Sequence, residues 1–140
     1  MSNLSFFYAD NAAGSSEERV VISNRFTDHD GVPLEWVLRS ITERENEACR
    51  KAATKREKGR NGVAVSDTDF NLYVAKMAVA SVVFPDLKDA GLQDSYNVRG
   101  AEELLRAMLL PGEYADLVQH VQRLNGFEKD MNEMVDEVKN

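Results

Sequence analysis

The chain has 140 residues, with 24 acidic and 17 basic side chains and a formal net charge of −7. This length suits one domain with a single core, and 43% hydrophobic with 29% charged residues is typical of a soluble globular protein. No apolar run reaches the roughly 18 residues of a membrane span, and no basic segment followed by an apolar run begins the chain. The single cysteine, Cys49, excludes an internal disulfide. We therefore expect one domain over residues 1–140, located in the cytoplasm.

Charge is distributed unevenly along the chain. Residues 44–62 carry seven basic and three acidic side chains, whereas residues 101–140 carry four basic and nine acidic ones. An acidic region of this size repels nucleic acid, because phosphate contacts dominate nucleic-acid affinity. It also favours solubility.

The first eleven residues contain an apolar cluster with no periodic continuation. Its members are Leu4, Phe6, Phe7 and Tyr8. Two alternatives stay open: a short helix docked on the core, or an exposed segment that contacts a partner.

Residues 19–41 have the two-residue periodicity of β-strands. Apolar residues occupy nearly every second position on both sides of Asp30 and Gly31. An Asp-Gly pair supplies the positive φ that a tight hairpin turn needs. We therefore predict an antiparallel hairpin over about 19–41, with Trp36 and Phe26 on its buried face.

The rest of the chain has helical periodicity. Thr42 and Glu45 form a capping box, which predicts a helix from 42 to about 55, followed by a basic loop at 57–62. The next helix begins at 66–69, reaches about 84 and is apolar on nearly all sides, which indicates a central position. Amphipathic stripes and caps predict three more helices, at 101–110, 111–124 and 130–138. The expected fold class is α+β, mainly α: an N-terminal antiparallel β-hairpin packed on a bundle of about five helices, over about 42–138.

No motif for catalysis or metal binding is present in the sequence. His29 and His120 are far apart, and Cys49 has no second cysteine to form a metal pair. The turn at 28–31 fails the calcium-loop pattern, so His29 is expected on a solvated turn. His120 is expected at the surface, and Cys49 as a small buried apolar residue. We expect no enzymatic activity, no cofactor and no bound metal.

A cluster of cations allows a rival interpretation. Its members are Arg50, Lys51, Lys55, Arg56, Lys58 and Arg60. Such a patch is compatible with a nucleic-acid-binding regulator acting through residues 50–60. The segment has no interleaved aromatic side chains for base stacking, and cations near a helix C-terminus are stabilising in their own right. A solvated helix end with a loop is therefore favoured.

Several motifs in order along the whole chain carry a family resemblance. They are MSNLSFF at 1–7, LEWVLR at 34–39, YVAKMAVA at 73–80, VFP at 83–85, LQDSY at 92–96, GAEELLRAML at 100–109, PGEYAD at 111–116 and NGF at 125–127. Together they resemble the XkdN-like tail assembly chaperones of phages and prophages of Gram-positive bacteria. Leu110 departs from the pattern: the family commonly has a small hydroxyl residue there, so this helix cap is weaker.

The resemblance implies a chaperone in the host bacterial cytoplasm that binds the tape measure protein, aids tail tube assembly and is absent from the mature particle. It also implies, in many phages, a longer frameshifted form that recruits the tail tube protein. The alternative is a small virion-structural or adaptor protein of the tail, which would have the same composition. No membrane partner is expected.

A chaperone of this kind needs apolar surface that the core does not use. The candidates are terminal, and they would contact the tape measure protein or a second copy of the chain. They are Leu4, Phe6, Phe7 and Tyr8 at one end, and Phe127, Met131, Met134 and Val138 at the other.

Overall fold

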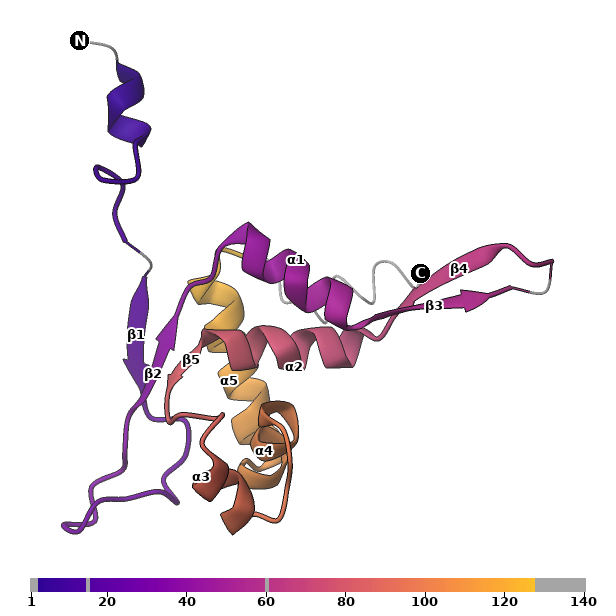
Figure 1. The fold of residues 1–140 in the computed structure, drawn as a ribbon. Helices are drawn as coiled ribbons and strands as arrows, with labels where there is room; N and C mark the ends of the chain where they lie inside the picture. Colours follow the sequence, from indigo (N-terminus) through magenta and orange to yellow (C-terminus); the bar gives the residue numbers. More distant parts are fainter. Residues whose placement is uncertain (1–2, 15, 60, 128–140) are drawn as a thin grey trace.

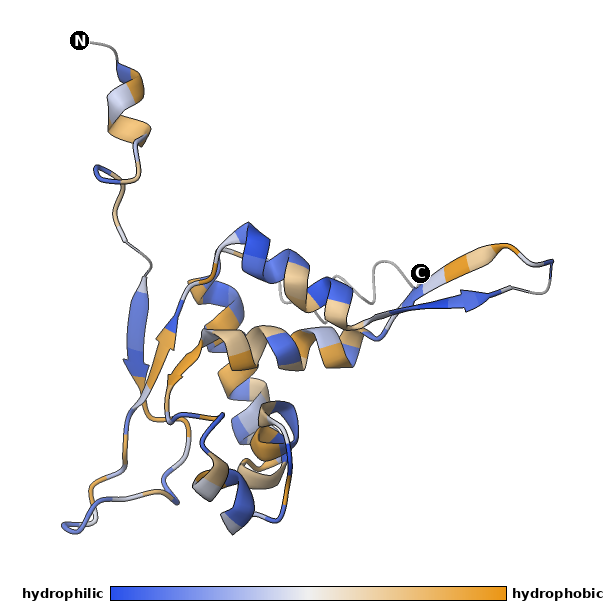
Figure 2. Cartoon of the chain, viewed as in Figure 1, coloured by the Kyte–Doolittle hydropathy of each residue, from blue (hydrophilic) through white to orange (hydrophobic). Residues whose placement is uncertain are grey.

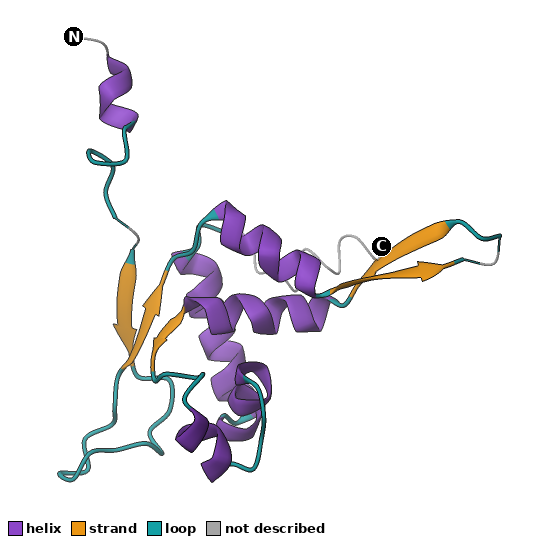
Figure 3. Cartoon of the chain, in the orientation of Figure 1, coloured by secondary structure: helices purple, strands orange, loops and turns teal. Residues whose placement is uncertain are grey.

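The computed structural model describes residues 3–14, 16–59 and 61–127. Helices pack on one side of a small sheet, and two thin segments extend away from this body (Figures 1 and 3). The fold is α+β, as the sequence predicts. The elements are a 3-10 helix η1 (Asn3–Phe7), strands β1 (Glu17–Val20) and β2 (Trp36–Arg39), helix α1 (Glu43–Ala52), strands β3 (Thr54–Lys58) and β4 (Ala64–Thr68), helix α2 (Phe70–Ser81), strand β5 (Val82–Phe84), and helices α3 (Ala90–Ser95), α4 (Ala101–Met108) and α5 (Pro111–Leu124).

The N-terminal hairpin is confirmed, with shorter strands than expected. β1 and β2 pair antiparallel, ending at Val20 opposite Trp36. Beyond this pair the ladder stops, and a long connection leads to the predicted turn, where Gly31 has φ 78°. The Asp28 carboxylate accepts hydrogen bonds from the Asp30 and Val32 amides, 2.8 and 3.0 Å long. This Asx-type arrangement fixes the turn without a continuous ladder.

The core lies between this sheet and the helices. Trp36 is 2% exposed, and Phe26 is partly buried against the core, as predicted. The middle of α2 is central: Tyr73, Met77 and Ala78 are buried. The core also takes the apolar stripes of α4 and α5, namely Leu104, Leu105, Met108, Leu117 and Val121.

Residues 54–68 correct the sequence prediction most strongly. The first helix ends at Ala52 rather than 55, and residues 54–58 and 64–68 form a second antiparallel hairpin where a basic loop and a helix start were expected. The Thr54 hydroxyl donates to the Arg50 carbonyl at the helix end, and Gly62, with φ 77°, supports the reversal of the chain. The predicted helix start at 66–69 lies in this strand, and Asp69 alone is the N-cap of α2.

Two further elements were not predicted. α2 ends at Ser81, and the apolar run continues as β5, which pairs antiparallel with β2 to give the sheet order β1-β2-β5. The stretch around Gly91 is helix α3 rather than a plain link, because the Asp89 carboxylate caps it by accepting from the Leu92 amide. The predicted last helix at 130–138 lies outside the described residues.

Candidate partner-binding surfaces

The N-terminal apolar cluster is exposed rather than docked on the core. Leu4, Phe6, Phe7 and Tyr8 are 61%, 72%, 81% and 59% exposed. They belong to η1 and the turn after it, which stand off the body (Figures 1 and 2). We call residues 3–14 the N-terminal arm. It keeps its own local structure, with the Asn11 side chain donating to the Ser5 carbonyl at 2.7 Å.

The arm is joined to the body at a defined point. The Ser16 amide donates to the Ser40 hydroxyl at 2.9 Å, and the Ser40 amide donates to the Ser16 carbonyl at 2.8 Å. Ser40 immediately precedes Ile41, whose amide donates to the Asn125 side chain at 2.7 Å. The structure therefore brings the root of the arm and the end of α5 to the same edge of the body.

Phe127 lies at this edge but is not a free apolar side chain. It is partly buried against the core, and its amide donates to the Gln122 carbonyl at 3.0 Å. A hollow of about 170 Å³ separates it from the start of α1. The other predicted C-terminal contact residues, Met131, Met134 and Val138, lie outside the described residues.

A groove that sequence reasoning missed runs between α1, α2 and β5. Its volume is about 730 Å³, and apolar side chains line it, including Ala48, Ala52, Val79, Val83 and Leu87. Charged side chains also line it: Glu17, Arg39, Glu45, Lys76, Asp86, Lys88 and Glu102. A groove lined by both apolar and charged side chains suits an amphipathic helix or peptide. The groove was missed because strand β5 was missed. The apolar run at 74–84 gives no sign of where the helix changes to a strand.

Ion pairs fix two sides of this groove. The Arg39 guanidinium, at the end of β2, binds Glu45 of α1, with Nη2 2.6 Å from Oε2. This hydrogen bond, with those from Thr42, lowers the pKa of Glu45 to about 2. Lys76 of α2 pairs with Glu102 of α4 at 3.1 Å. The two ion pairs therefore connect β2 with α1 and α2 with α4, and all four of their residues line the groove.

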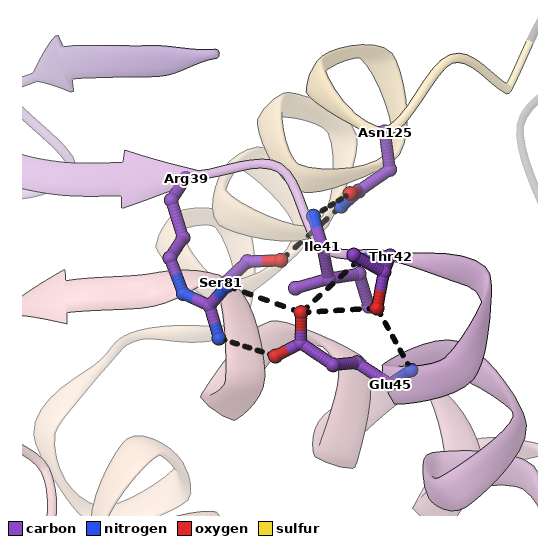
Figure 4. A network of polar contacts seen from close by, with 6 residues as sticks. All are labelled: Arg39, Ile41, Thr42, Glu45, Ser81 and Asn125. Carbon is purple, nitrogen blue, oxygen red and sulfur yellow. Dashed lines mark hydrogen bonds and ion pairs between the residues drawn. The ribbon is translucent and has the colours of Figure 1, made fainter. Parts of the chain in front are cut away.

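Asn125 joins three elements next to the root of the arm (Figure 4). Its side-chain oxygen accepts from Ile41, and its nitrogen donates to the buried Ser81 hydroxyl at 3.1 Å and to the Val121 carbonyl at 2.9 Å. The sequence predicts that Asn125 and Gly126 end this helix, and α5 does end at Leu124. The Asn125 side chain also holds α2 and the β2–α1 connection. The sequence could not predict these contacts, because they depend on tertiary packing.

A third ion pair holds the long β1–β2 connection to the helices. The Arg25 guanidinium donates to the Met108 carbonyl at 2.6 Å and to Glu113 Oε1 at 2.7 Å. Glu113 Oε1 also accepts from the Leu110 amide at 2.8 Å, which supplies part of the cap that Leu110 cannot. These bonds, that from Arg25 first, lower the pKa of Glu113 to about 2.

The residues with catalytic potential are not assembled into a site. His29 lies on the exposed turn, and Cys49 is buried, which raises the pKa of its thiol. His120 corrects the surface expectation: its side chain is only 16% exposed, because it packs beside β1 with Nδ1 3.0 Å from Glu18 Oε1. Within residues 3–14, 16–59 and 61–127, no group of three or more His, Cys, Asp or Glu side chains is placed to hold a metal ion. None of the described helices has the length and apolarity needed to cross a membrane.

An exposed apolar arm and an open groove define a protein whose visible surfaces are suited to binding. The family model described as phage XkdN-like tail assembly chaperone protein matches residues 4–139. The chain belongs to this family, which is a phage chaperone family and not a known enzyme family.

Two Bacillus subtilis (strain 168) proteins are similar over almost their whole length. The phage-like element PBSX protein XkdN is 33% identical over 99% of this chain and 94% of its own length. YqbN, described only as uncharacterized, is 31% identical over 99% of this chain and 93% of its own. The crystal structure of YqbN matches with a TM-score of 0.76 at 26% identity, covering 91% of this chain and 99% of that one.

Proposed function

We propose that this protein is a tail assembly chaperone that binds the tape measure protein in the host bacterial cytoplasm and is absent from the finished particle. The observation that carries the proposal is the N-terminal arm, whose Phe6 and Phe7 are 72% and 81% exposed. Leaving two phenylalanines in water is unfavourable, so their exposure beside Leu4 and Tyr8 on one arm favours a partner that covers them. Membership of the tail assembly chaperone family indicates that the process is phage tail assembly.

The partner's chemistry follows from the assembly problem. A long helical tape measure exposes apolar stripes until the tail tube encloses it, and such stripes aggregate. The arm and the groove offer apolar contacts beside charged residues, which match an amphipathic helix. The chain's net charge of −7 favours the solubility of a protein that handles apolar partners. Recruitment of the tail tube protein by a frameshifted longer form, and self-association through the same arm, belong to this proposal.

Co-expression with the tape measure protein tests the proposal. We expect Phe6→Asp with Phe7→Asp to leave the chaperone folded and to leave the tape measure insoluble. A second pair, Met131→Asp with Met134→Asp, tests the C-terminal candidates in the same assay.

The matched control is Val32→Asp with Leu110→Asp. These side chains are 55% and 54% exposed, so the control removes two exposed apolar groups and adds the same charge outside the arm and groove. If both terminal variants fold and still solubilise the tape measure, these contact residues are wrong. Analysis of the proteins in purified particles distinguishes a chaperone from the virion-structural alternative, because a permanent tail component would be found in them.

A further inference from the structure

The β3–β4 hairpin sorts its charged side chains onto two faces. Residues directly opposite one another in an antiparallel pair share a face, and successive residues alternate. The pairs Arg56–Ser66 and Lys58–Ala64 therefore lie on one face with Thr54 and Thr68, and the pairs Lys55–Asp67 and Glu57–Val65 lie on the other. The first face carries cations and hydroxyls without an acid, whereas the second carries one cation and two acids.

Helix α1 extends the cationic face at the base of the hairpin. Its last turn contributes Arg50 and Lys51, which line a hollow of about 480 Å³ together with Arg56 and the hydroxyl side chains Thr54, Ser66 and Thr68. Glu47 is the acid in this lining. We call Arg50, Lys51, Arg56 and Lys58 the basic face.

The basic face has little internal neutralisation. Arg50 is 3.6 Å from Glu43 and Lys51 is 3.4 Å from Glu47, and all four side chains are 47% exposed or more. Such exposed pairs contribute little and exchange readily for other carboxylates. Among the described residues, no ion pair involves Arg56 or Lys58.

The hairpin presents this face away from the body. Every residue from 55 to 58 and from 64 to 68 is exposed, and the ribbon extends outward beyond α1 and α2 (Figure 1). Its base is anchored by the Asp69 amide, which donates to the carbonyl of buried Ala53 at 2.8 Å, and by a 2.7 Å bond between the Thr54 and Thr68 hydroxyls. The Gly59 amide donates to the Val63 carbonyl at 2.7 Å near the tip. Pairing along the whole ribbon reduces the entropy lost on binding.

We propose that the basic face is an interaction surface for a carboxylate-rich protein segment. Four cations lie along one side of the ribbon, with the exposed Ser66 hydroxyl beside them, and such a row of cations matches a row of carboxylates. Nucleic acid fits less well, because residues 53–69 contain no aromatic side chain for base stacking and the chain as a whole is acidic. This surface is separate from the arm and the groove, and it recognises charge rather than apolar side chains, so it goes beyond the proposed tape measure contact.

A fluorescein-labelled peptide of alternating Glu and Gly, about 16 residues long, is a suitable probe for the full chain in anisotropy titrations. We expect saturable binding at about 50 mM salt that weakens as salt rises. Arg56→Glu with Lys58→Glu should weaken binding at least about tenfold. The matched control, Lys55→Glu with Arg99→Glu, makes the same change in net charge at exposed positions outside the basic face, the arm and the groove, and its affinity should stay within about twofold.

Three results would overturn the proposal: no saturable binding by the wild-type chain, equal losses in both variants, or tighter binding of a single-stranded oligonucleotide than of the peptide. The last result would assign the surface to nucleic acid. Circular dichroism checks the fold of each variant. If the charge reversal unfolds the chain, Arg56→Gln with Lys58→Gln replaces it, and retention of full peptide affinity by that variant also contradicts the proposal.

Discussion

The β1–β2 hairpin and the β3–β4 hairpin are both antiparallel pairs, yet the rest of the chain covers only the first. In β2, Trp36 and Leu38 are 2% and 0% exposed, whereas every residue of β4 is exposed. The first has large apolar side chains at alternate positions, and the second has charged and hydroxyl side chains there. An isolated two-stranded ribbon is marginally stable in water, so the second depends on its anchored base. The pattern of side chains therefore decides which hairpin builds the core and which stays available at the surface.

Removal of the largest buried group of the first hairpin should give the largest loss of stability. We expect Trp36→Ala to lower the free energy of unfolding by about 3–5 kcal/mol, because it empties a buried site. Denaturant titration followed by circular dichroism measures this. The matched change in the second hairpin, Val65→Ala, should stay within about 0.5 kcal/mol, and a similar loss in both variants would abolish the distinction drawn between them.

The Asn125 contacts that anchor the first hairpin should contribute less to the free energy of unfolding than Trp36 does. Asn125→Ala leaves the buried Ser81 hydroxyl and the Ile41 amide without this partner, and we expect a loss of about 1–3 kcal/mol in the same titration. Asn71→Ala, at an exposed position in α2, controls for replacement of an asparagine. A loss no greater than that of the control would show that water replaces the Asn125 contacts at little cost.

Acid should weaken the ties between the first hairpin and the helices. The folded pKa values of Glu45 and Glu113 are about 2, below the ordinary 4.5. A lowered carboxyl pKa contributes stability that is fully present above about 4.5 and is lost as pH falls toward 2. Glu45→Gln should remove its share of this pH dependence, roughly 1 kcal/mol or less for so exposed a pair. Unfolding titrations at about pH 6 and about pH 2.5 measure it, and an unchanged slope would contradict the assignment to Glu45.

The smallest effect on stability is expected on the basic face. Arg56→Ala with Lys58→Ala should change the free energy of unfolding by no more than about 0.5 kcal/mol, while reducing affinity for the acidic peptide. Thermal unfolding and the anisotropy titration separate the two quantities. A large destabilisation would mean that these cations hold the ribbon itself.

Local chemistry made the first hairpin and some of the helix limits predictable. The Asp30–Gly31 turn, the Thr42 capping box and the Asn125–Gly126 helix end each use short-range hydrogen bonds or backbone freedom that a few residues specify. The second hairpin was missed because its glycines and polar residues also suit a loop, and because strands without apolar alternation lack the usual signal. β5 was missed because a continuous apolar run has the same composition in a buried helix and in a buried strand.

For the candidate site, the sequence predicted which apolar residues were available but not how they are arranged in space. Phe6 and Phe7 stood out because no periodic element could take them, and the structure places them on an exposed arm. The groove could not be predicted, since its walls come from segments separated by tens of residues. Phe127 looked similar to Phe6 in the sequence, but its position two residues beyond Asn125 brings it against the core.

The N-terminal arm and the β3–β4 hairpin leave the body in different directions (Figure 1). At about 3.3 Å per residue, a five-residue strand adds roughly 16 Å of reach. A molecule with two such projections touches points farther apart than its own body is wide. If both proposed contacts are made on one assembly, engagement of the first raises the local concentration of the second, so two weak contacts act as one firm attachment that is still released one point at a time.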